Sequence, residues 1–335
     1  MTSRRDFLLK SSLFTSGLLL SDALWSFTPL APDQRDTFFD VVIVGGSFSG
    51  LSAALALGRS NRKVLILDTQ NPCNKMVKHA HNLLAQDGKS PVMIAHQAKE
   101  DVVRYDTVHY DLDEVTDVKK KEDDSFTVQS KEGKTFRAKY VLFATGLTDI
   151  MPDIPGFEAC WGISIAHCPY CHGYEVQNKK TLILGNGDFA FHYAILVHNL
   201  TSDLQIVTQG KASFTPKQLQ ALTKNKIGII EEEIVELTHN QGQITRVVLK
   251  TGQVVATEVI YARPNVKQHC EIPIHLGCTL TPQGLLQVNA NQETSVSGIY
   301  ACGDMSSFRS LATAIATGSQ AGAAINMQLC LDYFY

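Results

Sequence analysis

The 335-residue chain has little of several features that mark simpler classes of protein. Charged residues make up only 19%, with 30 Lys and Arg against 33 Asp and Glu, so the basic excess typical of a nucleic-acid binder is missing. The 11 prolines and 23 glycines are too few for a collagen-like or low-complexity chain. Eight cysteines are too sparse for a disulfide scaffold, so their positions must indicate what they do.

Hydrophobic residues, at 44% of the chain, are abundant enough to build sizeable cores and exclude a disordered protein. At about 150 residues per domain, the length predicts two domains.

The N-terminus predicts an export signal. Arg4 and Arg5 precede Phe7-Leu8-Leu9 and an uncharged stretch over 11–21, which resembles a twin-arginine signal. This stretch is shorter than the roughly 20 apolar residues that span a bilayer. The alternative is a frayed helix ahead of the first strand. We expect residues 1–35 to be a signal or tail and the protein to be exported to the periplasm; otherwise it is cytoplasmic.

A dinucleotide-binding pattern follows. A β-branched run over 40–44 leads into Gly-Gly-Ser-Phe-Ser-Gly at 45–50, and a helix is predicted over 51–57. A second apolar run, 64–67, ends at Asp68, which lies 23 positions after the first glycine. Strand, glycine turn, helix, strand and acid within one unit are typical of a nucleotide site.

Each residue type in this pattern has a physical reason. Gly45 permits the tight turn, Gly50 lets the helix pack close to the strand, and the helix N-terminus faces a pyrophosphate. Asp68 can accept a hydrogen bond from a ribose 2′-OH. Ser47 stands where a glycine is usual, and the alternative for the whole pattern is a purely structural turn.

The pattern recurs further along. The strand predicted over 180–184 leads into Gly-Asn-Gly-Asp-Phe-Ala at 185–190, and the next strand, 204–207, is followed by Thr208. No acid is present there to bind a 2′-OH, and no Arg to bind a 2′-phosphate; Lys211 is the nearest cation. The sequence therefore predicts either a second nucleotide site or a scaffold that no longer binds one.

Two further segments complete the first unit. The strand over 139–143 ends in Ala-Thr-Gly at 144–146, and a run over 298–301 leads to Gly303-Asp304. A helix rich in small residues, predicted over 311–324, allows close approach of a ligand or another helix. The first unit is therefore built from both ends of the chain.

These patterns predict an α/β protein with two Rossmann-like (three-layer ββα) nucleotide-binding domains, the second inserted in the first. We place the FAD-binding domain at 36–152 plus 270–335 and the NAD(P)-binding-like domain at 153–269. Short hinges are expected near 152–155 and 263–273.

The segment His167-Cys168-Pro169-Tyr170-Cys171-His172 contains a Cys-x-x-Cys pair between the two units. The pair closes a small ring, so its disulfide can form and break readily, and a helix N-terminus or a neighbouring cation lowers the pKa of a thiol. Three interpretations compete. They are a redox-active disulfide beside a flavin, attachment of a c-type haem, and half of a structural zinc site with Cys270 and Cys278 as the nearest other pair.

The order of these motifs resembles the low-molecular-weight thioredoxin reductase family of FAD-dependent class II pyridine nucleotide-disulfide oxidoreductases. The resemblance covers about residues 38–332. His172 after the second cysteine is similar to the dithiol oxidases of this superfamily, whereas thioredoxin reductases carry Asp there. The resemblance disfavours haem and zinc, so no metal site is expected.

The resemblance implies roles for particular residues. Cys171 matches the thiol that attacks the flavin, Cys168 matches the interchange thiol that meets the substrate, and His172 is a candidate proton donor. The residues implied to bind FAD are Gly45, Gly46, Ser47, Gly50, Asp68, Asn82, Thr145, Gly146, Gly303, Asp304, Arg309, Ser310, Leu311 and Ala312. For Asn82, in the region of His79 and His81, the alternative is a capped loop. The candidate NAD(P)-binding residues are Gly185, Gly187 and Ala190.

The family's His-Arg-Arg element for NADPH corresponds to Thr208-Gln209-Gly210 and is absent, so NADPH and NADH remain open. Cys73, Cys160, Cys302 and Cys330 are isolated and are expected to be small core residues.

The resemblance implies a homodimeric FAD enzyme that passes electrons between NAD(P)H, FAD, the Cys168–Cys171 disulfide and a thioredoxin-like protein or small disulfide. The alternatives are a flavin-dependent dithiol oxidase that uses oxygen and, outside enzymes, a flavin redox sensor. No nucleic-acid partner or integral membrane span is expected.

Overall fold

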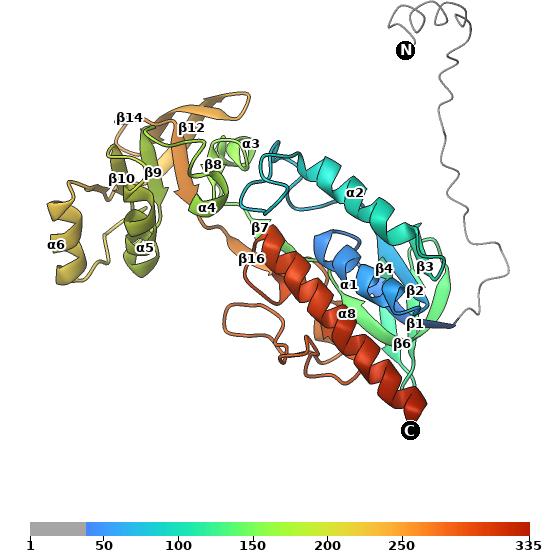
Figure 1. Ribbon diagram of the computed structural model, residues 1–335. Helices are drawn as coiled ribbons and strands as arrows, with labels where there is room; N and C mark the ends of the chain where they lie inside the picture. Colours follow the sequence, from blue (N-terminus) through green and yellow to red (C-terminus); the bar gives the residue numbers. More distant parts are fainter. Residues whose placement is uncertain (1–37) are drawn as a thin grey trace, which may run out of the picture. The chain divides into compact units, whose positions relative to one another are not determined.

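A computed structural model describes residues 38–335 of the protein (Figure 1). The predicted export signal lies outside the described residues. Within 38–335, no helix is long and apolar enough to cross a membrane.

The first unit is a seven-stranded sheet assembled from both ends of the described chain. Its order is β3-β2-β1-β6-β5-β4, and the C-terminal strand β17 pairs in parallel with the last residues of β6. The strands are β1 Phe38–Val44, β2 Val64–Asp68, β3 Val108–Leu112, β4 Val115–Lys120, β5 Phe126–Ser130, β6 Thr135–Phe143 and β17 Ile299–Ala301. The central strands β1 and β2 are almost wholly buried, as expected of parallel strands rich in Val, Ile and Leu.

Three helices belong to this unit: α1 Phe48–Arg59, α2 Pro91–Val103 and α8 Leu311–Phe334. Helix α1 contacts both α2 and α8 (Figure 1). Helix α8 approaches α1 so closely that a Cβ at Gly318 would lie 2.1 Å from the carbonyl oxygen of Ser49. Helix α8 runs ten residues beyond the predicted end at 324, because Ile325 and Leu329 continue its buried face.

The second unit is a five-stranded parallel sheet in the order β11-β10-β9-β15-β8, flanked by an antiparallel sheet of β12, β13 and β14. The strands are β8 Ile165–Ala166, β9 Thr181–Leu184, β10 Leu204–Val207, β11 Gly228–Ile230, β12 Ile234–Asn240, β13 Gln243–Leu249, β14 Val254–Ala256 and β15 Val259–Ala262. Its helices are α3 Phe157–Cys160, α4 Pro169–His172, α5 Gly187–His198 and α6 Pro216–Lys224. The mixed α/β fold confirms the predicted fold class.

A two-stranded antiparallel ribbon, β7 Leu147–Ile150 with β16 Asn265–Gln268, joins the chain segments that lead into and out of the second unit. The short elements α7 Ile272–His275 and η1 Gly303–Met305 complete the described chain. The segment predicted as a hinge at 263–273 therefore contains a strand and the start of a helix, held by the hydrogen bonds of the ribbon.

Candidate active site

The predicted FAD residues gather at the carboxyl ends of the parallel strands in the first sheet. The backbone N–H of Gly45 donates to Leu67 O (2.8 Å), and the N–H of Ala144 donates to Val44 O (2.8 Å). The Thr145 hydroxyl lies 3.8 Å from the sulfur of Met305, which follows Asp304. The glycine turn, the Ala-Thr-Gly turn and the Gly-Asp element thus share one edge of the sheet, where open α/β sheets bind ligands.

Asp68 is held in place at this edge from two sides. Its Oδ1 accepts a hydrogen bond from the N–H of Gly46 (3.0 Å), and its Oδ2 accepts one from the Tyr110 hydroxyl. A Cβ at position 46 would lie 2.9 Å from the Cβ of Asp68, so only glycine lets the turn approach the acid this closely. The Lys99 ammonium lies 3.5 Å from the centre of the Tyr110 ring. Tyr110 was not predicted, since nothing in its strand sequence marks the contact.

A pocket of about 310 Å³ opens beside Asp68. It is lined by residues at the ends of β2 and β3 together with the turn after β5: Asp68, Thr69, Gln70, Leu112, Asp113, Glu114, Lys131 and Glu132. A carboxylate acceptor at the mouth of such a pocket suits the ribose and adenine of a dinucleotide.

Arg309 forms the second charged centre of the site. Its guanidinium makes a forked pair with Asp149 of β7, with Nη1–Oδ1 2.6 Å and Nη2–Oδ2 3.3 Å, and its Nε lies 3.6 Å from Asp304 Oδ2. The side chains of Asp149 and Arg309 are only 8% and 21% exposed. Burial raises the pKa of Asp304, and the charge of Arg309 opposes that shift. Asp149 could not be predicted from the sequence, because its partner Arg309 lies 160 positions away.

The other predicted FAD residues take varied places. Ser47 is the N-cap of α1, with its hydroxyl not bonded to the helix, whereas Ser310 caps α8 by accepting from the N–H of Thr313 (3.0 Å). Leu311 is half-buried and Ala312 exposed. Asn82 is exposed in a loop where its N–H donates to Asp87 (2.7 Å), as the capped-loop alternative has it. The described geometry fits FAD at the Gly45 turn, Asp68, Gly303, Asp304 and Arg309; the role of each residue stays a prediction.

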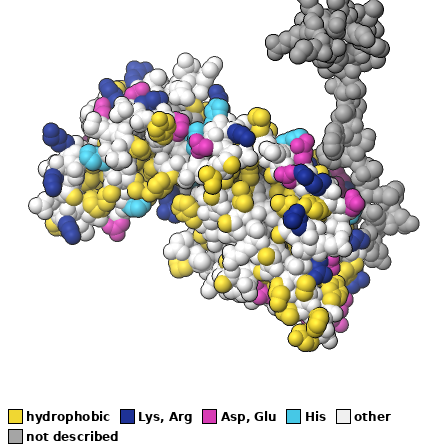
Figure 2. All heavy atoms as spheres, in the orientation of Figure 1, with side chains coloured by type: hydrophobic (Ala, Val, Ile, Leu, Met, Phe, Trp, Pro, Cys, Tyr) yellow, Lys and Arg dark blue, Asp and Glu magenta, His cyan; other side chains and the backbone are white. Residues whose placement is uncertain are grey.

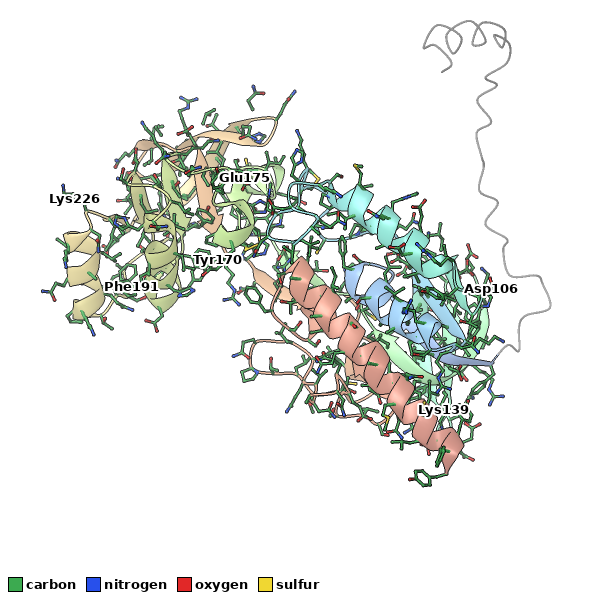
Figure 3. All side chains as sticks on the ribbon, in the orientation of Figure 1. Asp106, Lys139, Tyr170, Glu175, Phe191 and Lys226 are labelled. Carbon is green, nitrogen blue, oxygen red and sulfur yellow. A yellow bond between two sulfur atoms is a disulfide. The ribbon has the colours of Figure 1, made fainter. Side chains whose placement is uncertain are left out.

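Cys168 and Cys171 are joined by a disulfide, with their Cα atoms 5.3 Å apart. Cys168 is the N-cap of α4 and Cys171 lies inside this helix, and the N–H of Cys171 donates to Cys168 O (3.2 Å). Cys168 is buried and Cys171 half-buried. Tyr170 between them is 64% exposed, and Glu175 follows the helix (Figure 3). The tyrosine between the two cysteines is therefore at the surface, whereas Cys168 is not.

Histidines surround the disulfide segment. Burial lowers the pKa of His172, with Glu175 opposing the shift, and burial together with Arg309 lowers the pKa of His167 to about 4. His81 lies 3.4 Å from Glu175 and 3.6 Å from Asp87, which links the loop after β2 to the disulfide segment. At neutral pH, uncharged His172 can accept a proton and return it. His167 and Glu175 were not predicted as site residues.

The four isolated cysteines that were expected in the core divide into two groups. Cys160 and Cys302 are buried core residues, but Cys73 and Cys330 are exposed, so the prediction that all four lie in the core was wrong for these two. Cys73 lies in the loop after β2, and Cys330 lies on an exposed face of α8 beside Arg62 (Nη2–Sγ 3.0 Å).

The second glycine turn, 185–190, follows β9 and begins α5, with Ala190 buried. The residues after β10 are turned inward: the Thr208 hydroxyl donates to Gly210 O (2.6 Å), and Gln209 Oε1 accepts from the N–H of Ile234 (2.6 Å). Neither side chain is free to bind a 2′-phosphate. The residues 208–210 therefore do not match the His-Arg-Arg element for NADPH that the family carries.

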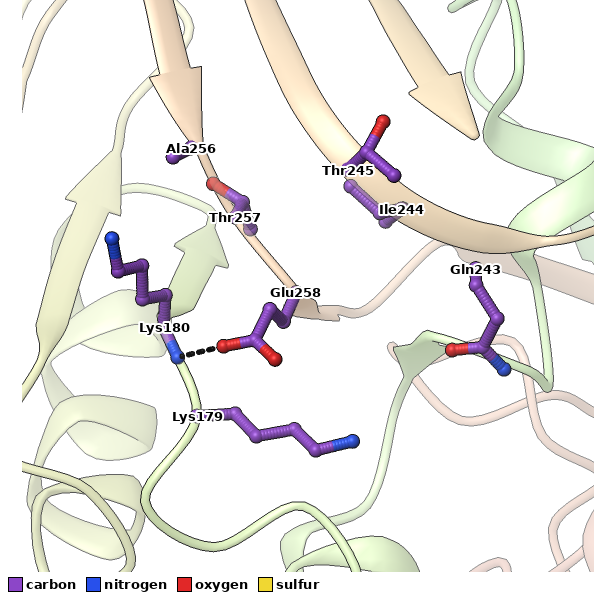
Figure 4. Close-up of a pocket in the computed structure, with 8 residues that line it drawn as sticks. All are labelled: Lys179, Lys180, Gln243, Ile244, Thr245, Ala256, Thr257 and Glu258. Atoms are coloured by element: carbon purple, nitrogen blue, oxygen red, sulfur yellow. Dashed lines mark hydrogen bonds between the residues drawn. The ribbon is translucent and has the colours of Figure 1, made fainter. Parts of the chain in front are cut away.

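Another pocket, of about 550 Å³, lies elsewhere in the second unit, where Lys180 N donates to Glu258 Oε2 at 3.1 Å (Figure 4). None of the residues lining it belongs to a glycine turn or to the disulfide segment: Lys179, Lys180, Gln243, Ile244, Thr245, Ala256, Thr257 and Glu258. It takes no part in the candidate active site.

Comparison with known proteins agrees with this geometry. The family described as Pyridine nucleotide-disulphide oxidoreductase matches residues 39–321. A thioredoxin reductase of Leptosphaeria maculans, sirT, is 30% identical over 312 residues, covering 88% of this chain and 95% of the relative.

Two solved structures are similar over nearly their whole length. A thioredoxin reductase of Bacillus anthracis, TrxB, superposes with a TM-score of 0.83 at 27% identity, covering 89% of this chain and 100% of the other. An oxidoreductase of Agrobacterium tumefaciens gives the same TM-score at 32% identity, covering 88% and 99%.

These likenesses confirm the resemblance inferred from the motifs, and they do not favour the oxidase and redox-sensor alternatives. The chain belongs to the pyridine nucleotide-disulphide oxidoreductase family, as a thioredoxin reductase-like flavoenzyme whose class uses FAD and NAD(P)H to exchange electrons with a disulfide.

Proposed function

We propose that this enzyme reduces the disulfide of a thioredoxin-like protein or of a small molecule through Cys168 and Cys171. The disulfide that joins these two residues carries the proposal, because it can exchange sulfur bonds with a substrate. When bound, FAD would supply the two electrons that, together with two protons, open this disulfide to a pair of thiols.

Exchange then proceeds on the chain's own sulfurs. The Cys168 thiolate attacks one sulfur of the substrate disulfide, so a mixed disulfide forms and the first substrate thiolate leaves. The Cys171 thiolate attacks Cys168 Sγ, which releases the second substrate thiolate and restores the Cys168–Cys171 disulfide. The substrate gains two electrons and two protons, and the enzyme loses them.

His172 moves the proton in this scheme. Its lowered pKa leaves the imidazole neutral near pH 7, so it can take the proton from a cysteine thiol and give it to the leaving sulfur. It directly follows Cys171 in the last position of α4.

The test separates the two cysteines. In Cys168→Ser, the remaining Cys171 thiolate should give a long-wavelength charge-transfer band with the flavin. In Cys171→Ser that band should be lost, and both variants should lose disulfide turnover. Near-normal turnover in either variant would contradict a mechanism that needs both thiols.

A homodimer is the proposed assembly. Met327 and Leu331 lie four residues apart on α8 and are exposed, and Tyr333, Phe334 and Tyr335 are exposed at its end. Hydrophobic side chains gather where α8 ends (Figure 2). Contiguous exposed apolar surface of this kind is typical of a protein interface, and a second copy of the chain would cover it.

Export through the twin-arginine route is the proposed localisation. Its support is the Arg4-Arg5 pair followed by the uncharged stretch 11–21. Changing both arginines to lysine should retain the protein in the cytoplasmic fraction of a bacterial host. A wild-type chain found only in the cytoplasm would exclude this route.

A further inference from the structure

The chain carries two glycine turns that can be compared position by position. The first is 45–50 and the second 185–190. The residue 23 positions beyond each first glycine is Asp68, the last residue of β2, in one unit and Thr208, directly after β10, in the other. By the same alignment, Gly46 corresponds to Asn186. Equivalent positions of the two turns can therefore be compared directly.

In the first turn, 45–50, no side chain of the turn itself bonds the loop after the next strand. Gly46 has no side chain, and its N–H donates to the carboxylate of Asp68. Asp68 in turn borders the pocket suited to a ribose and adenine.

In the second turn the side chain of Asn186 fills the corresponding place. Its Nδ2 donates to Lys211 O (2.9 Å) and Thr208 O (3.4 Å), both in the loop after β10. Its Oδ1 accepts from the N–H of Ser213 (2.9 Å) and from the Ser213 hydroxyl (3.0 Å). One side chain therefore ties the loop 208–213 onto the glycine turn.

Ser213 also lies against the second glycine of this turn. A Cβ at Gly187 would lie 2.9 Å from Ser213 Oγ, and the Ser213 hydroxyl donates to Asn186 Oδ1. A diphosphate approaches the helix N-terminus past bare backbone at such a glycine. The Ser213 side chain, held by Asn186, therefore lies beside the backbone that a diphosphate would approach.

We propose that the hydrogen bonds of Asn186 hold the loop 208–213 against the second dinucleotide turn, so that NAD(P)H binds only when this loop is released. The proposal rests on the NAD(P)H-dependent class of the enzyme and identifies the residue that limits access of its electron donor. A site that must first open binds with an affinity reduced by the fraction of molecules in the open state.

The experiment is a calorimetric titration of the holoenzyme with NADP⁺ and, separately, with NAD⁺. Asn186→Gly gives the second turn the residue that the first turn has at Gly46, and it should bind both nucleotides at least tenfold more tightly than wild type. Ser213→Ala removes only one of the hydrogen bonds to Asn186 and should give a smaller gain. Asn225→Gly is the matched control: it also removes an asparagine that bonds a backbone carbonyl (Ala221 O, 2.8 Å), at the end of α6, and should leave both affinities unchanged.

Equal affinity in wild type and Asn186→Gly would overturn the proposal, as would failure of both to bind. Tighter binding by wild type would make Asn186 a nucleotide ligand and would also overturn it. If Asn186→Gly folds poorly, as judged by its melting temperature, Asn186→Ala replaces it with the same expectation.

The readout is independent of the disulfide chemistry. A variant with both Cys168→Ser and Cys171→Ser should bind NADP⁺ as wild type does. Disulfide reduction by chemically reduced wild-type enzyme tests the proposed function separately, so failure of one leaves the other standing.

Discussion

Arg309 is the residue through which several parts of the site are joined. Asp149 lies in the ribbon strand β7, Asp304 in the Gly-Asp element, and His167 is close enough for Arg309 to contribute to its lowered pKa. A buried guanidinium that loses its carboxylate is left with an unpaired charge, which is far more costly than losing a pair on the surface.

Asp149→Ala is therefore expected to lower the free energy of unfolding by about 3 kcal/mol, the usual scale for breaking a buried ion pair, and to weaken FAD retention. Glu233→Ala is the control, because its partner Lys250 is well exposed; it should leave the free energy of unfolding nearly unchanged. Urea unfolding and the ratio of flavin to protein after gel filtration measure the two effects. Equal losses for both variants would show that Asp149 does not hold a buried charge.

His167 gives a pH-dependent prediction. Its pKa in the folded protein is about 4, against about 6.5 in an unfolded chain, so between these values the unfolded state binds more protons. The contribution of neutral His167 to the free energy of unfolding is fully present above pH 6.5 and is lost as the pH falls toward 4. Linkage gives about 2 kcal/mol of loss from this group between pH 7 and pH 5.

His167→Gln removes the titrating group, so the unfolding free energy of this variant should fall by about 2 kcal/mol less than that of wild type over the same pH interval. His275→Gln, at the end of α7, is the control and should follow wild type. Parallel pH profiles for wild type and His167→Gln would contradict the burial of a neutral imidazole.

At the scale of elements, strands and glycine turns could be predicted because their signals are local. The runs at 40–44 and 64–67 combine β-branched residues with a following glycine or acid, and the structure has strands there. The end of α8 and the ribbon of β7 with β16 could not be predicted in the same way. The ribbon exists because two short segments more than 100 residues apart pair with each other, and neither carries a strong strand pattern alone.

The packing of α8 on α1 gives the next prediction. In an exposed helix interior, Gly→Ala stabilises by about 1 kcal/mol. Gly318→Ala should do the opposite, because the new Cβ would lie 2.1 Å from the Ser49 carbonyl oxygen. Overpacking of this kind should cost about 1–3 kcal/mol and loosen the Gly45 turn, so FAD should dissociate more easily.

Ala316→Gly, on the exposed face of the same helix, separates packing from helix propensity. The free energy of unfolding of this variant should fall by about 1 kcal/mol through helix propensity alone, and the variant should keep its flavin. Melting temperatures and flavin fluorescence released on dilution distinguish the two variants. A more stable Gly318→Ala would mean that α8 can move away from α1 without loss.

For the whole molecule, the motifs predicted the family and the general location of the site, but not the contacts that hold it. Gly45, Asp68 and the Cys168–Cys171 pair were visible because their residue types and spacing are unusual. Tyr110, Asp149 and the bonds of Asn186 arise only when distant segments meet, so an ordinary tyrosine, aspartate or asparagine gave no signal. The hydrogen bonds of Asn186 also show that a glycine pattern can predict a nucleotide fold without predicting what its turn contacts.

The apolar end of α8 gives the last prediction, which concerns the assembly. If a second copy covers Met327 and Leu331, light scattering after gel filtration should give twice the mass of one chain. Met327→Glu with Leu331→Glu would place two unpaired carboxylates in the interface, and burying such charges is costly. This double variant should run as a monomer at micromolar concentration while it keeps bound FAD, since neither residue belongs to the flavin site. Val254→Glu, which changes an exposed valine on β14, should remain dimeric. A wild-type monomer, or a double variant that still dimerises, would place the interface elsewhere or exclude it.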